Sequence, residues 1–149
     1  MTAARAPALP RRLASGVYEL LIAIAIAMVA TVPYVVLFGD ASSGWRRHAL
    51  QAWLVVVLGL YFTWFWTRGG QTLPMRTWRI RLVRASDGGP VNPGRAAHRF
   101  AIAVLGFLAA GLGFAWALVD RDRQFLHDRL AGTALVEETN SPDKVGTPG

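Results

Sequence analysis

Three long apolar runs that contain no charged side chain constrain this sequence more than any other feature. The runs are Leu20–Phe38, Ala49–Trp66 and Phe100–Val119, and they contain 19, 18 and 20 residues. An α-helix of that length extends for roughly 27–30 Å, about the thickness of the hydrocarbon core of a bilayer. Helices at the edge of a soluble bundle keep a polar stripe, and none of these runs has one. The sequence therefore predicts an integral membrane protein of the all-α class with three transmembrane-length helices.

The distribution of positive charge predicts how these helices are oriented. The chain has a net charge of +7; residues 1–16 contain three arginines and no acid, and residues 67–99 contain seven arginines against Asp87 alone. Basic loops stay on the cytoplasmic side. We therefore expect the N-terminus and the 67–99 loop to be cytoplasmic, in a bacterial inner membrane. Because the charge flanks the apolar runs and Lys144 is the only lysine, we expect no nucleic-acid partner.

The third apolar run leaves two topologies open. Gly106, Gly111 and Gly113 weaken a helix near the middle of this run. A continuous span over 100–119, which the length of the run favours, places the C-terminus outside the cell. A break at the glycines that turns the chain back places the C-terminus inside.

The polar segments predict a small cytoplasmic strand and turn region. Residues 78–83 alternate large apolar residues with arginine, a period-2 pattern typical of a strand. Residues 87–90 read Asp-Gly-Gly-Pro and predict a turn. Residues 134–136 predict a second short strand, and the two strands can pair only if the C-terminus is cytoplasmic.

These features predict one membrane domain between two tails. We expect a basic tail over 1–10, a domain over 11–136 with spans at about 17–38, 49–66 and 100–119, and a disordered tail over 137–149. The chain has no cysteine, which excludes disulfides and thiol chemistry.

One pair of charged residues lies at the start of the first span. Arg12 and Glu19 are seven residues apart, so they share a helical face, and the other residues of that face are small. An ionisable residue in a membrane segment normally faces protein or water. Two interpretations stay open: Glu19 takes part in function, or it pairs with an arginine and holds helices together.

Three motifs, in this order, resemble the RDD family of small membrane proteins. The first is Arg12-Leu-Ala-Ser-Gly-Val-Tyr-Glu19, with glutamate where the family usually has aspartate. The second is the turn Gly70-Gln71-Thr72, after which Leu73-Pro74-Met75 replaces the usual Pro-Gly-Lys and Arg76 would take the place of the lysine. The third is the C-terminal signature His127-Asp128-Arg129-Leu130-Ala131-Gly132-Thr133.

The resemblance extends from about Arg11 to Val136 and implies a charged network of Arg12, Glu19 and Asp128. It implies a structural, accessory or transport-assisting membrane component without catalytic activity. The alternative that it implies is a monovalent cation–proton exchanger, for example of Na⁺ for H⁺, with Glu19 and Asp128 as ion- or proton-binding groups. We expect no enzyme activity, cofactor or metal. His127 next to Asp128 has no third partner at a suitable spacing, so a catalytic pair is not predicted.

The bilayer is the first partner that the sequence predicts. Four loop arginines are candidates for contact with anionic headgroups, which contributes about 1 kcal/mol for each basic residue near the surface. They are Arg76, Arg79, Arg81 and Arg84. A homo-oligomer or a membrane client protein is left open as a further partner.

Overall fold

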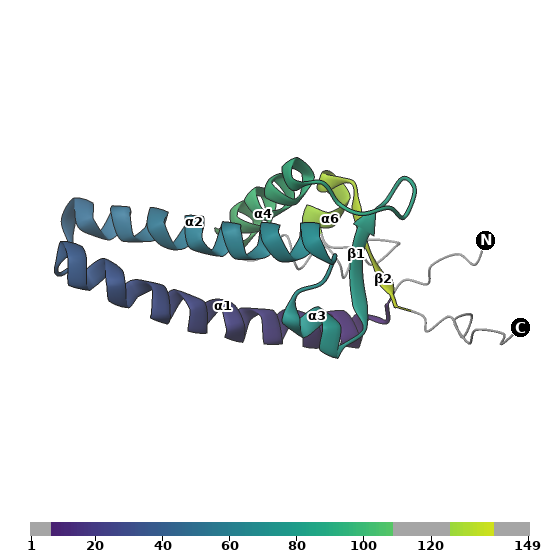
Figure 1. Ribbon diagram of the computed structural model, residues 1–149, viewed down its shortest axis with the longest axis horizontal. Coiled ribbons are helices and arrows are strands. Elements are labelled where there is room, and N and C mark those ends of the chain that lie inside the picture. Colours follow the sequence, from purple (N-terminus) through teal and green to yellow (C-terminus); the bar gives the residue numbers. More distant parts are fainter. Residues whose placement is uncertain (1–6, 109–125, 139–149) are drawn as a thin grey trace, which may run out of the picture.

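The computed structural model describes residues 7–108 and 126–138. The elements in these ranges are α1 (Leu9–Phe38), α2 (Gly44–Arg68), α3 (Leu73–Thr77), β1 (Ile80–Arg84), α4 (Pro93–Leu108), α6 (Leu126–Ala131) and β2 (Thr133–Glu137). Figure 1 shows α1 and α2 as a long antiparallel hairpin, with α4 packed beside α2. The other four elements gather where α1 begins and α2 ends. We call α3, β1, α6 and β2, with their connecting turns, the end module.

Two hydrogen bonds connect α1 to α2 near the turn of the hairpin. The indole Nε1 of Trp53 donates to the carbonyl of Ala30 at 3.0 Å, and the hydroxyl of Tyr34 donates to the carbonyl of Arg46 at 3.1 Å. Ala30 is buried, and a small residue at such a contact allows close approach of two helices. The predicted small-residue face of α1 therefore meets α2 at Ala30.

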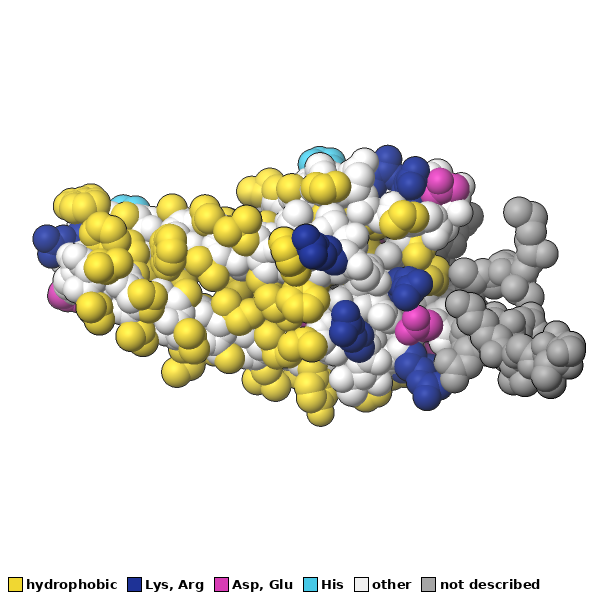
Figure 2. All heavy atoms as spheres, in the orientation of Figure 1, with side chains coloured by type: hydrophobic (Ala, Val, Ile, Leu, Met, Phe, Trp, Pro, Cys, Tyr) yellow, Lys and Arg dark blue, Asp and Glu magenta, His cyan; other side chains and the backbone are white. Residues whose placement is uncertain are grey.

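Most large apolar side chains of α1 and α2 face outward. Val29, Val36 and Leu60 are 72 %, 78 % and 68 % exposed. The helical stretches Pro10–Phe38 and Gly44–Thr77 are long and apolar enough to cross a membrane. Figure 2 shows apolar side chains along the hairpin and charged ones toward its two ends. Because a soluble protein buries such side chains and large apolar surfaces mark contact sites, the two helices fit a membrane protein.

Both predicted strands are present and they pair with each other. β1 and β2 are antiparallel, with Ile80 opposite Glu137 and Arg84 opposite Thr133. β1 starts two residues later than the alternation predicted, because α3 continues to Thr77 and Arg79 has a left-handed φ of 52°. The predicted turn after β1 is closed by a bond of 2.9 Å from the amide of Arg84 to the carbonyl of residue 89.

The pairing of β1 with β2 agrees with the topology in which the chain turns back. A single crossing over 100–119 would separate the two strands by a bilayer, whereas both lie in the end module. α4 contains residues 100–108 of the third apolar run. Residues 109–119 lie outside the described ranges, so the third span stays a prediction.

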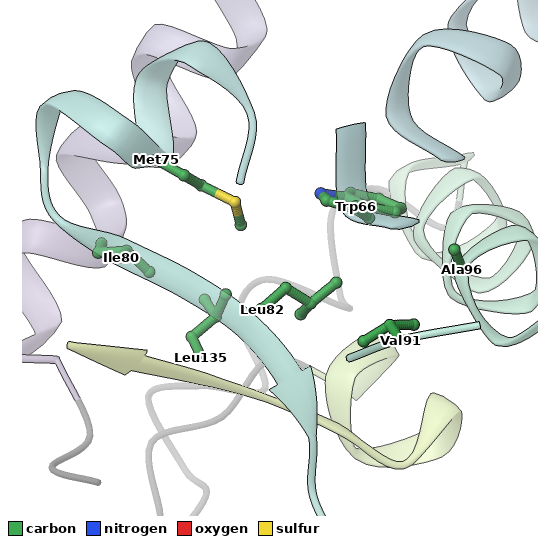
Figure 3. Packing of buried hydrophobic residues seen from close by; sticks show 7 residues of the cluster. All are labelled: Trp66, Met75, Ile80, Leu82, Val91, Ala96 and Leu135. Atoms are coloured by element: carbon green, nitrogen blue, oxygen red, sulfur yellow. The ribbon is translucent and has the colours of Figure 1, made fainter. Parts of the chain in front are cut away.

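The apolar core lies mainly in the end module. Its members are Trp66, Met75, Ile80, Leu82, Val91, Ala96 and Leu135. Figure 3 shows the strand residues beside Met75 of α3 and Trp66 of α2, with Val91 and Ala96 on the α4 side. Ile80 and Leu82 are 0 % and 1 % exposed, on either side of exposed Arg81. Burial of one such side chain stabilises by about 1.5–3 kcal/mol, so this core fixes the sheet against α2 and α4.

α1 begins at Leu9, before the span predicted at about 17–38, and Pro10 is tolerated because the first turn of a helix needs no amide donor there. One predicted boundary needs correction. The tail predicted from 137 begins too early, because Glu137 belongs to β2 and the amide of Glu138 donates to the carbonyl of Arg79 at 2.9 Å. Residues 1–6 and 139–149 lie outside the described ranges.

Candidate functional site

A buried ion pair connects α4 to α6, which belongs to the end module. Nε of Arg99 donates to Oδ1 of Asp128 at 2.6 Å, and the two residues are 4 % and 1 % exposed. The guanidinium of Arg99 also lies over the ring of Trp66, 4.1 Å from its centroid. A cation over an indole contributes about 2 kcal/mol when it is desolvated. Arg99 is thus held by a carboxylate and by an aromatic face at the same time.

Asp128 has further partners from its own segment. The hydroxyl of Thr133 lies 3.3 Å from Oδ1 of Asp128 and 3.3 Å from its backbone carbonyl, and Nε2 of His127 lies 3.8 Å from Oδ2. The chain reverses from α6 into β2 at Gly132, whose φ of 62° favours glycine. The carbonyl of Gly132 accepts from Arg95 at 3.4 Å. The C-terminal signature therefore folds around the carboxylate of Asp128.

The surrounding groups determine the protonation states of Asp128 and His127. Burial by itself would raise the pKa of Asp128, but the charges of Arg99 and His127 and the hydrogen bonds from Arg99 and Thr133 hold that pKa below its usual value. Burial lowers the pKa of His127 to about 4, against the opposing attraction of Asp128. At neutral pH, Asp128 is therefore ionised and His127 is neutral.

The Gly-Gln-Thr turn connects the end module to α1. Thr72 is fully buried, and its hydroxyl donates to Oε1 of Glu19 and accepts from the amide of Met75 at 3.4 Å, which caps α3. Nε2 of Gln71 donates to the carbonyl of Ile80 and to Oε2 of Glu138, both at 3.0 Å. The turn thus contacts α1, β1 and the end of β2.

Gly70 brings this turn against β1. Its φ is 67°, and its carbonyl accepts from the amide of Leu82 at 2.7 Å. A Cβ at this position would lie 2.7 Å from the carbonyl oxygen of Leu82. Only glycine fits this backbone conformation and this distance.

The structure brings together the three charged residues that the sequence indicated. Arg12 is 3 % exposed and interacts electrostatically with Asp128, and the carboxylate of Glu19 interacts with both Arg99 and Asp128. We call Arg12, Glu19, Arg99 and Asp128 the charged cluster. Two guanidinium groups and two carboxylates give it a formal charge of zero when all four are ionised.

The sequence reasoning missed Arg99, the direct partner of Asp128. Arg99 is one of seven arginines in residues 67–99, whose total charge indicates the topology. A total charge does not show which of these arginines pairs with Asp128. Its position, directly before the third apolar run, was the available signal. A charge at the edge of an apolar segment needs a partner, and Asp128 follows that run in the sequence.

The four loop arginines lie outside the charged cluster. Arg81 pairs with Glu138 at 3.0 Å and Arg84 with Asp87 at 3.3 Å, all on the surface. Arg76 and Arg79 are also exposed. Their contact with lipid headgroups stays a prediction. The described part of the chain contains no group of three His, Cys, Asp or Glu residues that could hold a metal ion.

The comparisons with known proteins agree with the motifs. The family model described as the RDD family matches residues 6–132. This range includes α1, the Gly-Gln-Thr turn, α4 and α6, and so all four residues of the charged cluster. No curated protein and no solved structure matches the chain.

Proposed function

We propose a structural, non-catalytic role for this chain, which belongs to the RDD family. In this proposal the protein is an accessory or transport-assisting component of the bacterial cytoplasmic membrane. The charged cluster clamps the end module onto α1 and α4, with the N-terminus on the cytoplasmic side. The observation that carries the proposal is the buried pair between Arg99 and Asp128, at 2.6 Å.

The geometry of Asp128 supports a clamp better than an exchange site. A group that exchanges protons near neutral pH needs a pKa close to that pH, whereas Arg99 holds the pKa of Asp128 below its usual value in spite of burial. A cation site also needs excess negative charge, and the two arginines of the charged cluster balance its two carboxylates. Removal of one partner from a buried pair costs about 3–5 kcal/mol, as expected for a clamp.

Glu19 supports the alternative, a monovalent cation–proton exchanger. Its carboxylate accepts from the neutral hydroxyl of Thr72, and the residue is half-buried in the helix proposed to cross the membrane. A carboxylate in such a place can bind a proton or a hard cation such as Na⁺. In this alternative Thr72 orients the carboxylate, and Asp128 adds negative charge nearby.

Transport measurements on purified protein separate the two candidates. The full chain is reconstituted in vesicles that contain a pH-sensitive dye, and a Na⁺ gradient is imposed. The structural role predicts that the wild type and Glu19→Gln both give the proton flux of empty vesicles. A Na⁺-dependent flux in the wild type that Glu19→Gln abolishes, at equal incorporation, overturns the structural role and supports exchange.

A further inference from the structure

A hollow of about 360 Å³ lies at the C-terminal end of α2. Its lining comes from residues 67–70 at the end of α2, residues 81–83 of β1 and the turn at 88–90. Four of the lining residues are glycines, and none is acidic. The hollow is separate from the charged cluster, since none of the four cluster residues lines it.

Arginines outnumber carboxylates around the hollow: Asp87 lies beside the lining at Gly89, but it pairs with Arg84. Arg68 and Arg81 line it, and NH2 of Arg76 lies 3.7 Å from where a Cβ of Gly69 would be. Arg81 is paired with Glu138, whereas Arg68 and Arg76 form no ion pair with any residue of 7–108 or 126–138. The last carbonyls of α2 oppose an anion with a partial charge of about −0.5. Two uncompensated guanidinium groups outweigh that charge, so the hollow attracts an anion.

An apolar ridge on α2 leads from the membrane to this hollow. Leu60, Trp64 and Arg68 are four residues apart and therefore lie on one face of the helix. Leu60 and Trp64 are 68 % and 55 % exposed, and Cζ of Arg68 lies 3.8 Å above the Trp64 ring. In Figure 2 the apolar side chains along the hairpin give way to basic ones toward the end module. A free phosphate would use only the arginines, whereas a phospholipid uses the arginines and the ridge.

We propose that this hollow binds the headgroup of an anionic phospholipid. Arg68 and Arg76 contact the phosphate, and an acyl chain lies along Leu60 and Trp64. A guanidinium suits this role because its planar set of donors matches two phosphate oxygens at once. This inference rests on the membrane placement of α1 and α2, and it adds Arg68 to the loop arginines of the sequence prediction.

Native mass spectrometry of the full chain tests this site. The protein is released from nanodiscs that contain equal amounts of phosphatidylglycerol and phosphatidylcholine, and the retained lipids are counted. We expect the wild type to retain phosphatidylglycerol preferentially. We expect Arg68→Gln to reduce the preference about fivefold, the equivalent of about 1 kcal/mol for one basic residue. Arg68→Gln with Arg76→Gln should remove most of the preference.

Arg46→Gln is the matched control. Arg46 also contacts a tryptophan, with its Cζ 5.9 Å from the Trp45 ring, but it lies at the opposite end of the hairpin. The control should keep the preference of the wild type. Equal losses in Arg46→Gln and Arg68→Gln, or no preference in the wild type, overturn the inference.

Two further outcomes separate this inference from its premises. Release of the lipid by an equal concentration of inorganic phosphate would show a site for soluble anions and overturn the lipid assignment. Failure of the wild type to float with vesicles would instead overturn the membrane placement. Melting curves of the variants, unchanged from wild type, show that a lost preference is not lost folding.

Discussion

At the scale of single residues, the charged cluster brings together two arginines and two carboxylates from three helices, α1, α4 and α6. Asp128 and Glu19 were identifiable because acids are rare beside apolar runs. Arg99 was not, since its pairing with Asp128 at 2.6 Å depends on how α6 packs on α4. The motif indicated Thr72 but not its partner. Its hydroxyl donates to Glu19, and this pairing also depends on how distant segments pack. Long-range packing decides such pairings.

Gly70→Ala should destabilise the end module. The substitution places a Cβ 2.7 Å from the carbonyl oxygen of Leu82 and forces alanine to a φ of 67°. We expect a loss of about 1–3 kcal/mol, seen as a lower melting temperature in nanodiscs. Gly16→Ala is the control, because nothing lies within 4 Å of a Cβ there, inside a helix. It should stabilise by up to about 1 kcal/mol; equal effects of the two variants would contradict the close approach of Gly70 to β1.

Acidification should destabilise the fold through His127 and Asp128. The pKa of His127 is about 4 in the folded protein and 6.5 in its ordinary state. Between these pH values the unfolded chain binds more protons, so stability falls as the pH falls from about 6.5 to about 4. Below that range Asp128 adds to the loss, since its folded pKa lies below its ordinary value. Melting temperatures measured from pH 7 to 4 should show this slope.

His127→Gln should flatten that pH dependence between 6.5 and 4. Glutamine has no titrating proton, so the contribution of His127 disappears while that of Asp128 remains. An identical slope in the variant and the wild type would show that His127 is not buried in its neutral form.

At the scale of elements, the existence of the strands could be predicted and their register could not. Alternation of Ile80, Arg81 and Leu82 reveals a strand with one buried face. The alternation indicates neither the register with β2 nor the hydrogen bonds of Gly70 and Gln71 to the backbone of β1. The length of the third run favoured a plain span, and the packing of β2 on β1 instead agrees with a chain that turns back.

Engineered cysteines should report the register of the sheet. The natural chain has no cysteine, so each introduced pair is free of background. Arg81→Cys with Val136→Cys places two thiols directly opposite. Arg81→Cys with Ala134→Cys is out of register by two residues. We expect oxidation to cross-link the first pair much faster, as judged by gel mobility; equal rates would contradict the pairing.

At the scale of the whole molecule, the sequence predicted a membrane protein and the exposed apolar surface of the hairpin fits one. The sequence could not show that its polar parts form one module. The end module lies beside the start of α1 and the end of α2, and it includes the C-terminal strand β2. In the proposed orientation this whole end lies on the cytoplasmic side of the membrane, and the turn at 39–43 lies on the external side.

Thiol labelling should confirm that orientation. Ser42→Cys lies in the hairpin turn and Ser86→Cys in the turn after β1, at opposite ends of the molecule. In intact spheroplasts, a membrane-impermeant maleimide should label Ser42→Cys alone, and both after lysis. Labelling of Ser86→Cys in intact spheroplasts would reverse the proposed topology.

The stabilising role of the Arg99–Asp128 pair is tested most directly by comparing the stability of the wild type with that of two variants. Melting in nanodiscs should show Asp128→Asn less stable than wild type by about 3–5 kcal/mol, because Arg99 is left buried without its charged partner. Arg99→Met with Asp128→Leu should recover most of that loss, since apolar side chains replace a buried pair without an orphaned charge. An Asp128→Asn protein as stable as wild type would contradict the clamp.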